Sequence, residues 1–225
     1  ADSIEVLTNI NFEIKKNSFN LIVGPSGSGK STILDLISTF RVPNQGQILI
    51  NDIPLSYEYQ NQIKSQISYL PQDAVFFETN LLDHITYNQP MDKDLLSTSL
   101  ELSGVNEFID INKDLKLVKL NENASNFSGG QKQRIDLARI IYENRSIIVL
   151  DEPTNQLDYE QENKFVNNIK EVIRKRDLIA IMITHKIELG ELVDNIILLE
   201  KGHVMAQGKH KEIANKVNWY NNKFK

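Results

Sequence analysis

Short apolar runs, separated by longer segments with helical spacing of apolar residues, are the main pattern along this chain. Three runs are rich in β-branched residues and nearly continuous, at residues 21–23, 147–150 and 179–183. A strand that is buried on both faces of a parallel sheet needs apolar side chains at successive positions. The pattern therefore predicts an α/β fold in which helices separate the strands of a mainly parallel sheet.

Two segments nearer the N-terminal end carry weaker strand signals. Ile10, Phe12 and Ile14 alternate with polar residues, and the apolar residues 48–50 precede a polar turn at 51–52. Period-two alternation is typical of a half-buried strand. We therefore expect a small antiparallel sheet beside the parallel one.

Residues 73–144 follow a different pattern. Their apolar residues have helical spacing and no strong strand signal. We expect an inserted helical subdomain here, with residues 1–72 and 145–225 forming the rest of a single domain of 225 residues. The apolar residues concerned are Leu81, Leu82, Ile85, Leu95, Leu96, Leu100, Leu102, Val105 and Phe108.

Four large apolar residues stand among lysines and asparagines near the C-terminal end: Val217, Trp219, Tyr220 and Phe224. They predict a terminal helix that docks on the core, and a partner-binding patch is the alternative.

The segment 24–31 reads Gly-Pro-Ser-Gly-Ser-Gly-Lys-Ser and follows the first apolar run. Glycines let the backbone N–H groups approach phosphate oxygens, Lys30 adds a positive charge, and the Ser31 hydroxyl can bind Mg²⁺. A helix expected from Ser31 to about Thr39 would point its positive end at the phosphates. A glycine-rich turn that binds nothing is the alternative, but the segment fills every fixed position of the phosphate-binding pattern.

Asp151 and Glu152 follow the run at 147–150. Ligands of open α/β sheets bind at the carboxyl ends of the strands. Asp151 there suits the Mg²⁺ shell, and Glu152 could orient or deprotonate a water that attacks the terminal phosphate. The alternative is an ordinary acidic helix start before Pro153.

A second glycine-bearing turn, Phe-Ser-Gly-Gly-Gln-Lys-Gln-Arg at 127–134, leads into a segment with helical spacing of apolar residues. The exposed N–H groups at such a helix start form another anion site. Here the sequence resembles the ATP-binding cassette (ABC) family, whose signature is Leu-Ser-Gly-Gly-Gln. Phe127 replaces the leading leucine, and the other four positions match.

The resemblance covers nearly the whole chain, with motifs in the family's order. Residues 69–73 resemble the glutamine loop, 151–154 the second acidic motif, 155–158 the aspartate loop that contacts the other subunit, and 183–185 the switch-histidine segment. The resemblance implies a P-loop NTPase (RecA-like) core with a small antiparallel β subdomain and an inserted α-helical subdomain.

The resemblance also implies ATP and Mg²⁺ as cofactors, and ATP held between two copies of the chain in a head-to-tail dimer. Ser128, Gly129 and Gly130 of one copy would bind the γ-phosphate of ATP on the phosphate loop of the other. Catalysis would depend on Lys30, Gln72, Glu152 and His185, and the metal would be organised by Ser31, Gln72 and Asp151. The nucleotide-binding residues implied are Gly24, Pro25, Ser26, Gly27, Ser28, Gly29, Lys30, Ser31, Thr32, Ser128, Gly129, Gly130, Gln131 and Asp158.

Within the family, the segments 75–85 and 208–213 and the acidic residue Glu122 resemble exporters, whereas Pro153 is closer to importers and soluble members. We expect an exporter ATPase whose transmembrane domain is fused in a preceding segment or is a separate subunit. The alternatives are an importer subunit, a soluble ATPase that acts on ribosomes or DNA, and a catalytically idle module that uses ATP only to dimerise.

Composition narrows these alternatives. The formal net charge of −5 argues against a general nucleic-acid binder, and the absence of cysteine excludes disulfides and thiolate metal sites. The apolar runs are far shorter than the roughly 20 residues of a membrane-spanning helix, and no signal peptide is evident. We expect the chain at the cytoplasmic face of the membrane, held there through the transmembrane partner.

The resemblance also implies an aromatic residue, well before the phosphate loop, that stacks on adenine. Phe12 is the only aromatic residue before Phe19, and its alternation with Ile10 and Ile14 predicts a core position. We therefore expect this chain alone to bind ATP more weakly than low-micromolar affinity, because stacking of a base on an aromatic side chain contributes roughly 1–3 kcal/mol.

Overall fold

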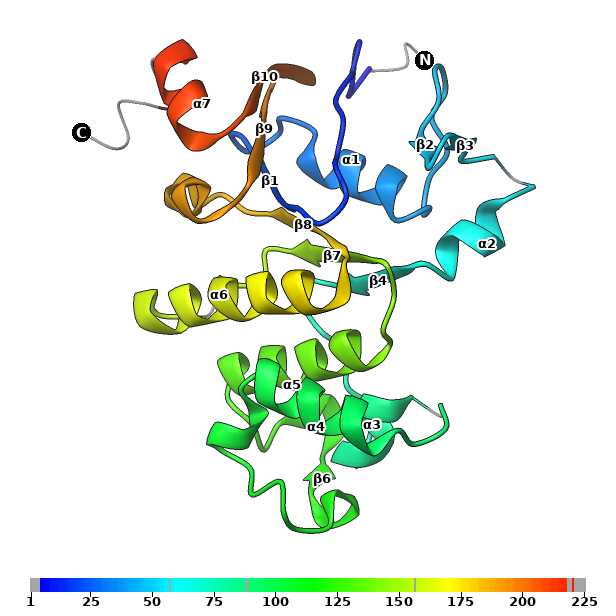
Figure 1. Ribbon diagram of the computed structural model, residues 1–225, viewed down its shortest axis with the longest axis vertical. Helices are drawn as coiled ribbons and strands as arrows, with labels where there is room; N and C mark the ends of the chain where they lie inside the picture. Colours follow the sequence, from blue (N-terminus) through cyan, green and yellow to red (C-terminus); the bar gives the residue numbers. More distant parts are fainter. Residues whose placement is uncertain (1–4, 57, 88, 156, 218–219, 221–225) are drawn as a thin grey trace.

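A sheet with strand order β10-β9-β1-β8-β7-β4 forms the centre of the molecule (Figure 1). The computed structural model describes residues 5–56, 58–87, 89–155, 157–217 and 220. All neighbouring strands are parallel except β9 and β10, which are antiparallel. The strands are β1 (Phe19–Val23), β4 (Ile67–Leu70), β7 (Ile147–Asp151), β8 (Ile179–Ile183), β9 (Asn195–Glu200) and β10 (His203–Gly208).

The three predicted parallel strands are confirmed as parts of β1, β7 and β8. Burial on both faces explains their continuous apolar sequence. In β1, Phe19, Leu21 and Val23 pack in one hydrophobic cluster, while Ile22 packs in another on the opposite face of the sheet.

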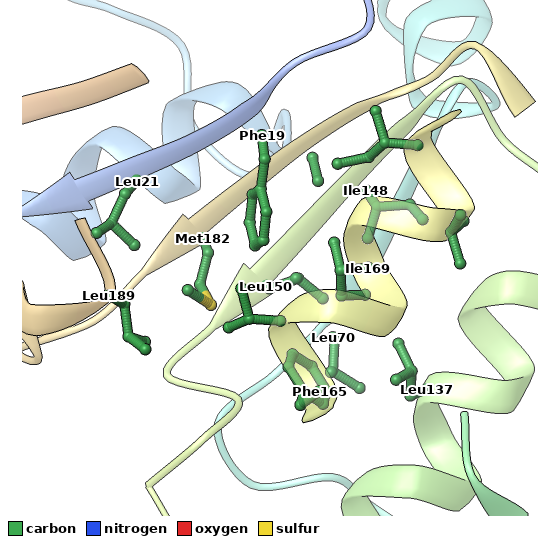
Figure 2. Packing of buried hydrophobic residues seen from close by; sticks show 14 of the residues in the cluster. Phe19, Leu21, Leu70, Leu137, Ile148, Leu150, Phe165, Ile169, Met182 and Leu189 are labelled. Atoms are coloured by element: carbon green, nitrogen blue, oxygen red, sulfur yellow. The ribbon is translucent and has the colours of Figure 1, made fainter. Parts of the chain in front are cut away.

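Helices cover both faces of this sheet. On one face, α6 and α5 contribute to a cluster with the strands, and Figure 2 shows Phe165 and Ile169 of α6 turned toward Leu150 of β7. On the other face, Ile33 and Leu34 of α1 pack against strand residues. The helices are α1 (Lys30–Ile37), α2 (Gln60–Lys64), α3 (Leu81–Thr86), α4 (Lys93–Leu102), α5 (Gly129–Tyr142), α6 (Tyr159–Arg176) and α7 (His210–Lys216).

The helix α6 illustrates how sequence sets the bounds of an element. Asp158 caps its first turn by accepting a hydrogen bond from the Gln161 N–H, and its last turn carries Arg174, Lys175 and Arg176. Acceptors at the start and cations at the end both oppose the partial charges of the helix termini. Asp177 then adopts a left-handed conformation, which ends the helix.

A third hydrophobic cluster lies apart from the sheet, and its buried members come from residues 76–142. Its members include residues of α3 and α4, together with Ile135, Ala138 and Tyr142 of α5. Both α3 and α4 pack against α5, in the lower half of Figure 1. Two-residue strands and 3₁₀ turns complete the fold: β2 (Leu49–Ile50), β3 (Ile53–Pro54), β5 (Thr79–Asn80), β6 (Lys119–Leu120), η1 (Val105–Glu107), η2 (Leu115–Leu117), η3 (Glu122–Ala124) and η4 (Ile187–Leu192).

Several expectations about local structure were wrong. Residues 10–14 form no strand, although Ile10, Phe12 and Ile14 are partly buried and Phe12 packs against the core as expected. The side chain of Gln207 donates a hydrogen bond to the Glu13 carbonyl at 2.5 Å, in place of a backbone ladder. The β2–β3 hairpin is antiparallel, and β10, which carries Gln207, pairs antiparallel with β9.

The sequence reading also missed strands. β4, β9 and β10 were not predicted, and β5 pairs with β6 inside the segment expected to lack strands. At the C-terminal end, Tyr220 is buried and Val217 packs on the same cluster, which confirms docking on the core for these two residues. Trp219 and Phe224 lie outside the described residues. Among the described residues, no helix is long and apolar enough to span a bilayer.

Truncation of a core leucine provides a test of this packing. Leu150 is fully buried in β7, so we expect Leu150→Ala to lower the free energy of unfolding by about 3 kcal/mol through lost contacts and a cavity. Leu117→Ala is the matched control, because Leu117 is 76% exposed and its truncation should change stability by less than about 0.5 kcal/mol. Urea unfolding followed by circular dichroism measures both, and equal effects would contradict the packing.

Candidate functional site

The carboxyl edge of the parallel strands collects most of the predicted site. The phosphate loop follows β1, Thr184 and His185 follow β8, and Asp151 and Glu152 stand at the end of β7. Because β8 pairs with both β1 and β7, these three segments lie side by side. Gln72 follows β4, which pairs with β7 on its other side, and its side chain is exposed.

The phosphate loop has the backbone shape that its glycines allow. Gly27 and Gly29 have φ values of 77° and 97°, in the region that side chains disfavour. A Cβ atom at Gly24 would lie 2.2 Å from the Leu199 carbonyl oxygen, so no larger residue fits there without movement. The Ser28 hydroxyl is buried and has no hydrogen-bond partner among the described residues, which leaves a polar group of the loop available to an anionic ligand.

Lys30 begins α1 and folds back over the loop. Its Nζ donates hydrogen bonds to the carbonyl oxygens of Gly24 at 2.8 Å and Pro25 at 2.9 Å. The residue is 5% exposed, and this burial lowers the pKa of the ammonium group, while the negative charge of Glu152 acts in the opposite direction. The cation therefore lies at the positive end of a helix, and no carboxylate in the described part of the chain forms an ion pair with it. This arrangement fits the charge of a polyphosphate.

Glu152 is held by two side chains. Its Oε1 lies 2.7 Å from Nε2 of His185, and its Oε2 accepts a hydrogen bond from the Asn155 side-chain amide. The backbone of Glu152 has a positive φ of 47°, and its N–H donates to the Ile183 carbonyl at the end of β8. The fold thus brings together Glu152 and His185, which the sequence assigned to one catalytic site.

Asp151 has a partner that the sequence analysis did not assign to the site. The Tyr69 hydroxyl donates to Oδ2 of Asp151 at 3.1 Å. Burial raises the pKa of the Asp151 carboxyl, the hydrogen bond from Tyr69 opposes this, and the charges of Glu152 and Asp35 raise it further. Tyr69 lies within the glutamine-loop motif, but no spacing rule indicates that its side chain reaches Asp151.

The predicted metal ligands are a hydroxyl, an amide and one carboxylate, from Ser31, Gln72 and Asp151. Oxygen ligands of this kind suit Mg²⁺, which keeps several waters and uses few protein carboxylates. In the described ranges, no group of three or more His, Cys, Asp or Glu residues could hold a metal ion.

The second glycine segment begins α5. Ser128 caps the helix by accepting a hydrogen bond from the Gln131 N–H, and the Gln131 side chain accepts one from the Ser128 N–H at 2.9 Å. A Cβ atom at Gly130 would lie 3.1 Å from Leu157 and 3.5 Å from Gln161. Its nearest neighbours thus come from the segment around Asp158 and from α6. Among the described residues, no hydrogen bond or ion pair joins residues 128–131 to the phosphate loop.

A glycine-rich phosphate loop before α1, with an acidic pair at the end of a nearby parallel strand, defines a P-loop nucleoside triphosphatase. Comparison with known proteins identifies the family. Residues 7–155 match the family model described as ABC transporter. The chain therefore belongs to the ABC transporter family, as an ATP-binding domain, and such domains are ATPases.

Similar curated proteins are named as export or translocation ATP-binding proteins. The chain is 34% identical over 223 residues to a putative export ATP-binding/permease protein of Rickettsia bellii, covering 99% of this chain and 38% of that protein. It is 36% identical over 213 residues to the alpha-hemolysin translocation ATP-binding protein HlyB of Escherichia coli, covering 94% of this chain and 30% of HlyB. The chain thus spans about a third of the length of these relatives.

A solved structure agrees with this family assignment. The chain resembles a bacterial Atm1-family ABC exporter with ATP bound, with a TM-score of 0.89 and 28% identity, over 100% of this chain and 39% of that one. The fold is therefore the P-loop NTPase fold of ABC ATPases, as the sequence predicted. The two relatives are named as export and translocation ATP-binding proteins, and the solved structure is that of an ABC exporter.

Proposed function

We propose that this chain binds and hydrolyses ATP to power export of a substrate through a transmembrane domain, either fused to it or on a separate subunit. The observation that carries the proposal is the pairing of Glu152 with His185 beside the phosphate loop, in a chain whose similar proteins are exporters. The chain would then act at the cytoplasmic face of the membrane. Glu122, which resembles an exporter residue that touches the membrane domain, is exposed as this role requires.

We assign nucleotide binding within one chain to residues 24–32. Lys30 and the N–H groups of residues 27–32 would hold the β- and γ-phosphates, and the unpartnered Ser28 hydroxyl is suited to join them. Mg²⁺, when bound by Ser31, Gln72 and Asp151, would supply positive charge to the phosphate oxygens. Tyr69 would keep one Asp151 oxygen occupied and so fix the direction of the other.

Hydrolysis requires a group that orients and deprotonates a water in line with the terminal phosphate. Glu152 is suited to this task, because His185 and Asn155 each hold one of its carboxylate oxygens. His185 is 47% exposed, so its ring can also reach a phosphate at the surface of the site. The charge that develops on the phosphate would be met by Lys30 and the loop N–H groups.

A second copy of the chain would complete the site. The start of α5 is formed by Ser128, Gly129, Gly130 and Gln131. Among the described residues, none of these four forms a hydrogen bond with the phosphate loop of its own chain, and a helix start of this kind binds anions. We propose that they meet the γ-phosphate of ATP on the partner copy, with Asp158 at the same interface. Gln156, in the same loop, lies outside the described residues.

We also propose the division of the chain into a core and a helical subdomain at residues 73–144. The separate hydrophobic cluster from residues 76–142 supports it. No nucleic-acid partner is proposed, because the net charge of −5 disfavours phosphate-backbone binding.

Loss of the phosphate-loop cation tests ATP binding. We expect Lys30→Met to weaken ATP binding by about 10- to 100-fold, because hydrogen bonds to charged groups contribute about 1.5–3 kcal/mol. Lys113→Met is the control, since Lys113 is 76% exposed in another part of the chain. Titration of a fluorescent ATP analogue measures both affinities. Equal affinities would refute the assignment of Lys30.

The export role has its own test. The natural gene, or one beside it, should encode several apolar segments of about 20 residues that form the membrane part. The ATPase should then sediment with membranes and require detergent for release. Release by salt alone from ribosomes or DNA would instead support the soluble alternative.

A further inference from the structure

Lys186, the residue after the switch histidine, joins two segments beside the candidate site. Its Nζ donates to the Thr154 carbonyl at 2.9 Å and lies 2.7 Å from Oε1 of Glu162, in the first turn of α6. The Glu162 side chain is only 8% exposed. An unpaired buried carboxylate is costly, so this ion pair links the start of α6 to the segment that follows β8.

The segments that Lys186 links belong to different halves of the proposed nucleotide site. On one side, the neighbouring His185 contacts Glu152, which serves the nucleotide bound by the same chain. On the other side, Leu157 and Gln161 are the closest neighbours of Gly130, which is proposed to serve the nucleotide of the second copy. Thr154 and Glu162, the two partners of Lys186, flank Leu157 and Gln161 in the chain.

We infer that Lys186 is a positioning residue that couples the two half-sites of one chain. It holds the start of α6, and with it the neighbours of Gly130, at a set position relative to His185. Movement of His185 on nucleotide binding would then be passed to the surface that faces the second copy. The inference rests on the proposed function, because it needs ATP shared between two copies.

A lysine is suited to this position because its ammonium group is a cation with three N–H donors, which can meet a carbonyl and a carboxylate at once. By contrast, Lys175 and Glu171 form an ion pair at 2.8 Å within α6, and their side chains are 47% and 39% exposed. Exposed pairs of this type contribute little to stability. Lys175→Met is therefore a matched control: it removes one positive charge, as Lys186→Met does, from an ion pair on α6, the helix that carries Glu162.

The experiment measures three properties of Lys186→Met, Lys186→Arg and Lys175→Met in the full chain. These are kcat for ATP hydrolysis, affinity of the monomer for a fluorescent ATP analogue, and ATP-dependent dimerisation by light scattering in a Glu152→Gln background. For Lys186→Met we expect kcat and dimer affinity to fall about tenfold while nucleotide affinity changes less than about twofold. Lys186→Arg should restore most of the loss, and Lys175→Met should resemble the wild type.

A second variant guards against simple misfolding. Lys186→Met combined with Glu162→Met removes both charges, and replacing a whole buried ion pair by apolar residues is often neutral for stability. The double variant should fold with a normal unfolding midpoint and still dimerise poorly, because the contact with Thr154 is lost. Normal dimerisation and kcat in this variant would overturn the coupling.

The other possible outcomes distinguish failure of the coupling from failure of the proposed function. If Lys186→Met loses nucleotide affinity in parallel with kcat, its role is local and the coupling is refuted. If only this coupling is wrong, wild-type protein still dimerises with ATP and Lys186→Met matches it. Wild-type protein that hydrolyses ATP without dimerising contradicts the proposed function itself, and the coupling with it.

Discussion

Glutamine in place of Glu152 is expected to lower kcat for ATP hydrolysis by about 10³-fold while ATP binding persists, since a positioned general base contributes about 10²- to 10⁴-fold. The substitution keeps the size of the side chain, and its carbonyl oxygen can still accept a hydrogen bond from His185 or Asn155. The neutral amide cannot accept a proton from water. ATP should therefore accumulate between two copies, and light scattering with ATP and Mg²⁺ should detect a dimer.

Glu160→Gln is the control for Glu152→Gln. Glu160 is an exposed residue in the first turn of α6, so its neutralisation changes the charge of the chain equally without touching the paired carboxylate. It should leave kcat within about twofold of the wild type. Hydrolysis by Glu152→Gln at the original rate would show that another group activates the water.

Arginine in place of Ser128 is expected to weaken ATP-dependent dimerisation by at least about 100-fold, and hydrolysis with it, because the interaction removed includes charge-assisted hydrogen bonds. Ser128 is exposed at the start of α5, and a long side chain there would fill the space proposed for the partner's γ-phosphate. ATP binding by the monomer should persist, since the phosphate loop is untouched. Light scattering and nucleotide titration separate the two effects.

Two controls separate bulk at this site from other effects of Ser128→Arg. Ser128→Ala loses the helix cap, at a cost of about 1 kcal/mol of stability, but adds no bulk. Ser97→Arg adds the same side chain to an exposed position of α4. Dimerisation should survive Ser97→Arg and be weakened less by Ser128→Ala than by Ser128→Arg. ATP-dependent dimers of Ser128→Arg as stable as the wild type would refute the role of this segment.

Local requirements explain which parts of the fold were predictable. β1, β7 and β8 are buried on both faces, and that condition leaves a continuous apolar run in the sequence. β4 is equally part of the sheet but contains Ser68 and Tyr69, so its signal is weak. Alternation at residues 10–14 correctly indicated one buried side, but it could not indicate whether a neighbouring backbone would supply a ladder.

Local motifs made one part of the candidate site predictable, and contacts between distant positions make up the other part. Glycines and a lysine at set spacing were visible in the sequence because the phosphate loop is a local structure. The Tyr69 contact with Asp151 spans 82 positions and the Lys186 contact with Glu162 spans 24. Neither pair has a spacing that a rule for strands or helices connects.

By itself, the sequence determined the family, the phosphate loop and the order of the motifs, because each depends on residues that are close together in the chain. Only the tertiary structure decided the strand order β9-β1-β8-β7-β4, which aligns the segments after β1, β8 and β7 at one edge. It also decided which side chains hold Glu152, Asp151 and Glu162. Contacts between distant segments depend on how whole elements pack. Many residues contribute to the free energy of this packing, so no single short motif specifies these contacts.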